Sequence, residues 1–106
     1  MYASIRTYRV GAGVIDAVLH RVDRDFAEAL AQEPGFVAYQ ALKIGDDRIC
    51  SWSIFSGREQ AEASNAIAAE WVADELSEFD IERMGVMSGE VMVSRARTEM
   101  LEPAHH

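Results

Sequence analysis

Residues 33–55 read EPGFVAYQALKIGDDRICSWSIF, and this stretch decides the fold. Pro34-Gly35 predicts the end of a preceding helix, because proline cannot continue the helical hydrogen bonding. Two runs rich in β-branched and aromatic residues follow, Phe36–Lys43 and Arg48–Phe55, and each run is typical of a strand. The loop Gly45-Asp46-Asp47 is so short that the two strands must pair antiparallel, as a hairpin.

The register of the hairpin predicts which side chains share a face. Pairing Ile44 with Arg48 beside the loop places Gln40 opposite Trp52, and side chains alternate between the faces along each strand. We expect one set to face the helices, and it consists of Phe36, Ala38, Gln40, Leu42, Cys50, Trp52 and Ile54. The other set points away from the helices and consists of Val37, Tyr39, Ala41, Ser51, Ser53 and Phe55.

A strand and a helix are predicted on each side of the hairpin. Before it, residues 2–9 suit a strand, and from Val14 apolar residues recur at helical spacing as far as Pro34. After it come a helix from Ser56-Gly57 to about Leu76, an acidic connection at Ser77–Arg83 and a last strand at Met87–Arg95. The order βαββαβ predicts an α+β, ferredoxin-like fold with an antiparallel four-stranded sheet of order 4-1-3-2 and both helices on one face.

Length and composition limit the class of protein. A chain of 106 residues makes one domain, which we place at residues 1–97, followed by a polar tail at 98–106 that ends in two histidines. The net charge of −8 disfavours a nucleic-acid partner. No apolar run approaches the roughly 18 residues of a membrane span, and the single Cys50 allows no internal disulfide. We therefore expect a cytoplasmic protein with no membrane partner.

The sheet face away from the predicted helices is too apolar to remain in water. It would carry Val37, Tyr39, Ala41, Phe55 and Met92, a large apolar and aromatic surface for so small a chain. The simplest cover is the same face of a second copy, which gives a two-fold homodimer whose two sheets close on each other as a dimeric α/β barrel.

Several of these residues resemble a known family. Pro34-Gly35-Phe36, the following Tyr39, the strand segment Trp52–Phe55, then Ser56 and a Glu- and Ala-rich second helix with Trp71 are similar to antibiotic-biosynthesis-monooxygenase-like proteins of the dimeric α+β barrel superfamily. The resemblance covers roughly residues 2–95. It implies a scaffold that serves cofactor-free oxygenases, haem-degrading enzymes and isomerases. In the oxygenases a phenol or quinol, bound between sheet and helices, is deprotonated and reacts directly with dioxygen, without cofactor or metal.

The resemblance also implies site residues. An asparagine and a tryptophan on or near the second helix accompany oxygenase activity in the family, and Asn65 and Trp71 are the candidates for these catalytic positions. Trp52 and Gln40 would line the substrate pocket from the sheet, and Tyr39 would help to orient a ligand. Each has a plainer interpretation: Asn65 hydrogen-bonded inside a filled core, Trp71 packed at its edge, and Tyr39 as core.

Arg6 is the remaining candidate for substrate binding. We expect Arg6 and Glu90 to project from neighbouring strands onto the face away from the helices, where they form an ion pair inside or at the rim of the barrel. The alternative role for Arg6 is a clamp for an anionic substrate. No cluster of cysteine and histidine has zinc spacing, and His20 lies on the solvated side of the first helix, so neither a metal nor haem is expected.

Two functions remain open at this point. One is a cofactor-independent monooxygenase-like enzyme that acts on a small aromatic or quinoid metabolite. The other is a non-catalytic homodimeric barrel that binds a small molecule or only assembles. An enclosed cavity of at least about 300 Å³ beside Asn65 would favour ligand handling, and a filled core would favour assembly alone.

Overall fold

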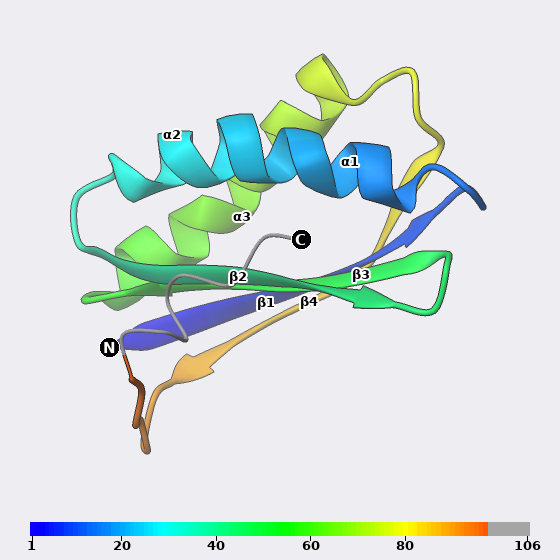
Figure 1. The fold of residues 1–106 in the computed structure, drawn as a ribbon. Helices are drawn as coiled ribbons and strands as arrows, with labels where there is room; N and C mark the ends of the chain where they lie inside the picture. Colours follow the sequence, from blue (N-terminus) through cyan, green and yellow to red (C-terminus); the bar gives the residue numbers. More distant parts are fainter. Residues whose placement is uncertain (98–106) are drawn as a thin grey trace.

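The computed structural model describes residues 1–97, so the predicted tail at 98–106 lies outside the described residues. The elements follow the predicted order and form two layers, with the helices above one face of the sheet (Figure 1). Their bounds are β1 Tyr2–Val10, α1 Ile15–Arg21, the π-helical turn η1 Val22–Phe26, α2 Ala27–Ala31, β2 Phe36–Ile44, β3 Arg48–Phe55, α3 Arg58–Glu75 and β4 Ile81–Glu90. No helix within residues 1–97 combines the length and apolar character needed to cross a bilayer.

The sheet has the strand order β2-β3-β1-β4, and every neighbouring pair is antiparallel. Read from the other edge, this is the predicted order 4-1-3-2. The helical layer covers one face only (Figure 1). The ferredoxin-like fold is therefore confirmed.

The first helical segment is continuous from α1 through η1 to α2 and ends before Pro34, as predicted. Gly35 makes the turn into β2 with φ +79°, a conformation that favours glycine. A Cβ at this position would also lie 2.7 Å from the Oγ of Ser56, so the chain passes too close for a side chain. The Pro-Gly pair thus both ends the helix and lets β2 approach the start of α3.

The hairpin register is as predicted, but the assignment of its two faces is wrong. Gln40 pairs with Trp52 and Ile44 with Arg48. Ser51, Ser53 and Phe55 are nevertheless buried on the helix-covered side, and Gln40 and Trp52 therefore lie on the other side. The prediction placed Ser51 and Ser53 on the face away from the helices, whereas both serines are buried beneath the helices.

The last strand begins and ends earlier than predicted. β4 covers Ile81–Glu90, so it includes the last three residues of the segment 77–83 that was expected to be a connection. Val10 pairs with Ile81, and a register shift between Thr7 and Tyr8 marks a bulge in the β1–β4 pairing. The acidic residues near Asp80 and Glu82 hid the alternating pattern of an edge strand.

The covered side of the sheet holds two apolar clusters. The first consists of Tyr8, Val10, Ile15, Val18, Ile49 and Leu76. The second consists of Phe26, Leu30, Phe55, Ala61 and Ala68. The two clusters pack the helices onto opposite ends of the sheet, and the candidate site lies where they meet.

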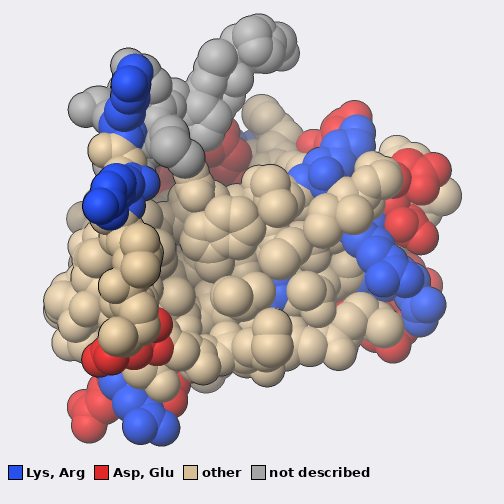
Figure 2. Space-filling view, turned by 90° about the horizontal axis from the view of Figure 1, so that it is seen from below, with Lys and Arg blue, Asp and Glu red and all other residues tan. Residues whose placement is uncertain are grey.

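The uncovered side of the sheet, here called the open face, is also apolar. It carries Ile5, Leu42, Ile44, Trp52, Ile54 and Met87. Leu42 is 47% and Met87 66% exposed. Figure 2, which views this side, shows a largely uncharged centre with most charged side chains at the margins. The face away from the helices is apolar, as expected, but the predicted residues Tyr39, Ala41 and Phe55 lie on the covered side instead.

Candidate functional site

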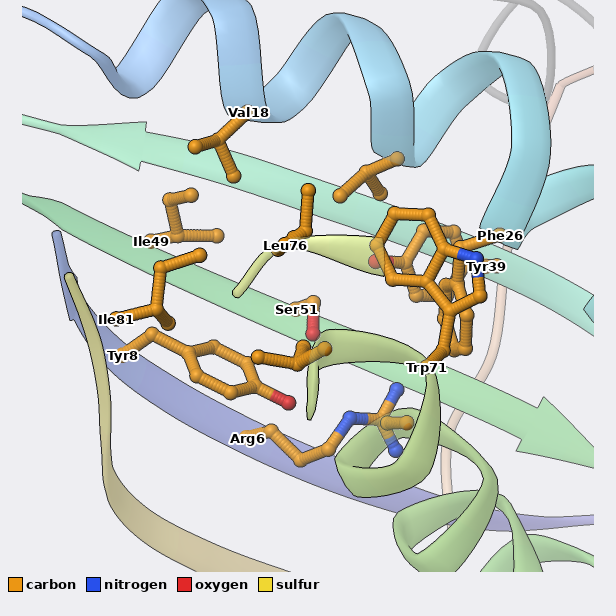
Figure 3. Close-up of a pocket in the computed structure, with 13 residues that line it drawn as sticks. Arg6, Tyr8, Val18, Phe26, Tyr39, Ile49, Ser51, Trp71, Leu76 and Ile81 are labelled. Carbon is orange, nitrogen blue, oxygen red and sulfur yellow. The ribbon is translucent and has the colours of Figure 1, made fainter. Parts of the chain in front are cut away.

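A small cavity lies between the sheet and the helices (Figure 3). Its volume is about 30 Å³, which is room for about one water molecule. Thirteen residues line it: Arg6, Tyr8, Val18, Val22, Phe26, Tyr39, Ile49, Ser51, Ala68, Trp71, Val72, Leu76 and Ile81. Asn65 is not among them. The cavity is therefore about tenfold smaller than the predicted ligand pocket, and it is not beside Asn65.

Aromatic rings form one end of the cavity. Phe26 packs edge-on against Tyr39, with ring centroids 5.4 Å apart, and also lies 5.4 Å from Trp71 at a tilt of 46°. Val22 and Phe26 both reach the cavity from η1, where the wider π-turn interrupts the helix. Such turns occur often at functional sites. Ala68 on α3 is small, so the rings rather than the helix surface set the width at this end.

Arg6 is the cationic group of the site and is fully buried. Its Nη1 donates to Oδ1 of Asn65 (2.9 Å) and to Oγ of Ser64 (3.2 Å), and its Nη2 donates to Oγ of Ser53 (2.5 Å). These three acceptors are neutral and come from α3 and β3. The guanidinium is therefore held rigidly from two elements, without a negative charge from any of them.

Asn65 connects Arg6 to a second group of hydroxyls. Its Nδ2 donates to Oγ of Ser4 at 3.2 Å. Ser4 in turn donates to the carbonyl oxygen of Ala61 at 2.7 Å, so the hydroxyl of Ser88, 2.8 Å away, must donate to Ser4. Both ends of the Asn65 amide are thus engaged. The hydrogen bonds that the plainer interpretation of Asn65 expected are present, the residue is partly buried, and its contact to the site runs through Arg6.

No carboxylate balances the charge of Arg6. None of the ion pairs within residues 1–97 includes Arg6 or Arg83, and the Nε atoms of both arginines are buried without a hydrogen-bond partner among these residues. Arg83 faces the same side of the sheet, because it pairs with Tyr8, and its Nη1 donates to the carbonyl oxygen of Asn65 at 3.1 Å. Burial lowers the pKa of Arg6, and the charge of Arg83 lowers it further. Two guanidinium groups therefore make this part of an acidic protein locally positive.

The two tyrosines of the cavity stay neutral near neutral pH. Burial raises the pKa of Tyr39 to about 12, although its hydrogen bond with Ser51 and the charge of Arg6 act in the opposite direction. Burial also raises the pKa of Tyr8, although its hydrogen bond with Arg6 (Figure 3) and the charges of Arg6 and Arg83 act in the opposite direction. Both hydroxyls are thus suited to donate hydrogen bonds and not to accept a proton.

The structure brings three of the six predicted site residues to the cavity: Arg6, Tyr39 and Trp71. Asn65 is one hydrogen bond away. Trp52 and Gln40 are misplaced in the prediction, because they lie on the open face, where Nε1 of Trp52 donates to Oε1 of Gln40 at 3.2 Å. The catalytic roles of Asn65 and Trp71 stay predictions.

The predicted ion pair between Arg6 and Glu90 is also wrong. Glu90 pairs with Tyr2 at the far end of β4, and Arg6 pairs with Val86 and turns toward the helices. The expectation placed Arg6 on the face away from the helices, inside or at the rim of the barrel, because it assigned the two faces of the sheet the wrong way round. A usable signal was present in the sequence: Ser4 and Tyr8 alternate with Arg6, and Ser51 and Ser53 supply polar atoms on the neighbouring strand.

Sequence reasoning missed most of the cavity wall. Phe26, which lines the cavity, belongs to an ordinary amphipathic pattern and was not singled out. Arg83, which lies outside the lining but binds Asn65, belongs to a segment predicted as a connection and was also missed. Within residues 1–97 no group of three or more histidine, cysteine, aspartate or glutamate side chains is placed to hold a metal ion.

Comparison with known proteins gives a fold and no more. No family model and no curated protein matches the sequence. A Deinococcus radiodurans protein described as a candidate antibiotic biosynthesis monooxygenase is 14% identical, with a TM-score of 0.68 over 92% of this chain and 99% of its own. MhuD, a haem degrader of Mycobacterium tuberculosis with two haems bound in its active site, is 22% identical, with a TM-score of 0.64 over 91% and 100%.

A third similar structure is SnoaB of Streptomyces nogalater, a cofactor-independent oxygenase solved as the variant N63A. It is 15% identical, with a TM-score of 0.59 over 88% of this chain and 95% of its own. Identities this low carry the fold and leave the chemistry open. The resemblance to antibiotic-biosynthesis-monooxygenase-like proteins is therefore confirmed for the fold, which this chain shares over nine-tenths of its length.

Proposed function

We propose that the protein is a cofactor-independent oxygenase for a small aromatic or quinoid metabolite, which binds between sheet and helices against Arg6, Tyr39 and Trp71. The observation that carries the proposal is a mostly apolar, aromatic-walled cavity whose one cationic group, Arg6, is buried without a counter-charge. Keeping a buried cation without an anionic partner costs free energy. An electron-rich oxygen atom of a bound substrate would offset this cost by pairing with the guanidinium of Arg6. A cofactor-independent oxygenase and a monooxygenase candidate have the same fold, so the fold is compatible with this chemistry.

The proposed reaction converts a phenol to a quinone. The ring carbon opposite the hydroxyl gains one atom of dioxygen, and the second oxygen atom leaves as water with the ring hydrogen and the hydroxyl hydrogen. Dioxygen is the only oxidant and is reduced by four electrons. The side chains of Phe26, Tyr39 and Trp71 exclude water from the substrate, and Arg6 binds the oxygen of the substrate. Asn65 acts as a positioning residue, since it binds the guanidinium and does not line the cavity.

A substrate ring needs more room than about 30 Å³. Trp71 is only half-buried and packs on Phe26 at the aromatic end of the cavity, so its rotation would open the space beneath it. Haem fits the lining less well, because that lining contains no histidine or cysteine to bind the iron. We therefore place a small phenol and not haem in this site.

The test is dioxygen consumption with 1-naphthol, in which 1,4-naphthoquinone is the expected product and oxidation without protein is subtracted. Asn65→Ala and Trp71→Phe should each lower the rate at least about tenfold, because each disturbs the placement of the ring or of Arg6. Gln40→Ala and Trp52→Phe are matched controls, since they remove the same groups from the open face. Unchanged dioxygen consumption in both site variants would contradict the proposal.

A second candidate function rests on the open face and on the small cavity. Monomeric proteins rarely leave so large an apolar surface in water, and a cavity for about one water molecule is close to a filled core. Both observations fit a non-catalytic homodimer whose open faces pack together as a barrel. Sedimentation should then show a dimer at micromolar concentration, and a folded monomer under these conditions would remove the dimer from both proposals.

A further inference from the structure

The walls of the cavity indicate which kind of small molecule fits it. Most of the lining side chains are hydrocarbon. The end away from the aromatic rings, here called the aliphatic end, is formed by Val18, Ile49, Leu76 and Ile81 with the ring of Tyr8 (Figure 3). A volume of about 30 Å³ admits a single molecule of about the size of water. The aliphatic end is therefore a small apolar compartment, distinct from the aromatic end.

The hydrophilic groups that line the cavity are hydrogen-bonded to other protein groups. The guanidinium of Arg6 is bonded to Tyr8 as well as to its three partners on α3 and β3. The hydroxyl of Tyr39 is bonded to Ser51. In Figure 3 the hydroxyl of Tyr8 points toward the guanidinium of Arg6 and away from Val18. A buried water needs about two to four polar partners, and aliphatic side chains cannot supply them.

We infer that the aliphatic end of the cavity is a binding site for dioxygen. Dioxygen is apolar, is comparable with water in size and needs no hydrogen bond, so it gains by leaving water for hydrocarbon walls. In the proposed reaction the ring enters at the aromatic end, where Trp71 rotates, and dioxygen lies next to it at the aliphatic end. The inference rests on the proposed oxygenase for the use of the bound dioxygen, but not for its binding.

The first test uses the paramagnetism of dioxygen, which speeds the nuclear relaxation of the methyl groups that it touches. Methyl relaxation is measured in the whole protein under several atmospheres of dioxygen, and again under the same pressure of nitrogen. The increase at Val18, Ile49 and Leu76 should be at least about threefold larger than at the control methyls. The controls are Val10 and Ile15, which are buried in the same apolar cluster but do not line the cavity. Equal increases in the two sets overturn the inference.

A substitution that fills the cavity tests the same point. Val18→Ile adds one methyl group at the aliphatic end, so the extra relaxation at Ile49 and Leu76 should fall to the level of the control methyls. The thermal unfolding midpoint should not be lowered, because the methyl group enters existing space. Val10→Ile is the matched control: it should lower the midpoint by overpacking the same cluster and leave the relaxation at Ile49 and Leu76 unchanged.

Undiminished relaxation in the Val18→Ile protein contradicts the inference. If this variant does not fold, the comparison of the two sets of methyl groups in the unaltered protein still decides the question.

Steady-state oxidation of 1-naphthol connects the site with the reaction. Val18→Ile should raise the KM for dioxygen at least about threefold and leave the KM for 1-naphthol unchanged. An unchanged KM for dioxygen overturns the part of this site in the reaction. Enhanced relaxation at the lining methyls without any oxidation of 1-naphthol refutes the oxygenase alone. Oxidation with equal relaxation in both sets of methyl groups refutes this inference alone.

Discussion

Both faces of the sheet carry apolar side chains, and they differ in what lies at their centres. The covered face is polar at its centre, where Arg6, Ser4 and Ser53 are fully buried, and the open face carries exposed Leu42 and Met87. A sheet with one solvated side ordinarily buries its apolar side chains and exposes its polar ones. The comparison teaches that the helices of one chain do not satisfy either face of the sheet. The open face needs a cover, and the covered face holds an unpaired charge.

Neighbouring residues on β3 give the largest contrast between the faces. Phe55 is almost fully buried in the second apolar cluster, and we expect Phe55→Ala to lower the free energy of unfolding by about 3–5 kcal/mol at any protein concentration. Ile54 points to the open face and is half-buried. Ile54→Ala should cost less at low concentration, and its cost should grow as the protein dimerises. Urea unfolding at two protein concentrations measures both, and a concentration-independent Ile54→Ala effect would count against the covered open face.

A charge placed on the open face should break the proposed dimer. Met87 is 66% exposed, so Met87→Glu should leave the monomer folded, whereas burial of the carboxylate between two sheets would raise the dimer dissociation constant about 100-fold or more. Sedimentation equilibrium measures the constant. Ala69→Glu on the exposed surface of α3 introduces the same charge elsewhere and should leave dimerisation unchanged. A dimer equally weakened by both substitutions would place the interface elsewhere.

The sequence predicts the strand order and the register of the sheet, but it does not predict which face the helices cover. The strand order and the Gln40–Trp52 pairing follow from short loops and alternation, and both are confirmed. The choice of face does not follow, because Leu42 and Ile54 are as apolar as the side chains that are actually buried. Hydrophobicity alone cannot decide between two apolar sides when the buried one also contains serines and an arginine.

The candidate site shows the same limit at the level of single residues. Trp71 and Asn65 were found through the family resemblance, which implies an asparagine and a tryptophan on or near the second helix. The role of Arg6 depends on which neighbours lie above it. Its partners Ser53 and Asn65 are 47 and 59 residues away in the chain, so no local pattern joins them. Tertiary contacts of this kind become visible only once the sheet and α3 are placed together.

A third prediction uses the buried hydroxyl of Tyr39. Its pKa is raised to about 12 from 10.0, so the folded state holds this proton more tightly than the unfolded state does. The resulting stabilisation is fully present below pH 10 and is lost as the pH rises from 10 to about 12. The loss is at most about 3 kcal/mol. In an ultraviolet titration of the native protein, Tyr39→Phe should remove the tyrosine that ionises last. Ionisation of all three tyrosines together near pH 10 would show that Tyr39 is solvated.

The smallest expected effect lies at the rim of the open face, where Arg9 donates to Glu82 at 2.7 Å and both side chains are more than half exposed. Water screens this pair, so Arg9→Gln should leave the thermal unfolding midpoint unchanged within error. The pair also tests the geometry of the dimer. If the rim is buried when two open faces meet, Arg9→Gln will weaken the dimer although it leaves the monomer unaffected. A weaker dimer with an unchanged monomer would therefore show that the interface includes the ends of β1 and β4. If neither the dimer nor the monomer changes, the interface is limited to the apolar centre around Ile5 and Trp52.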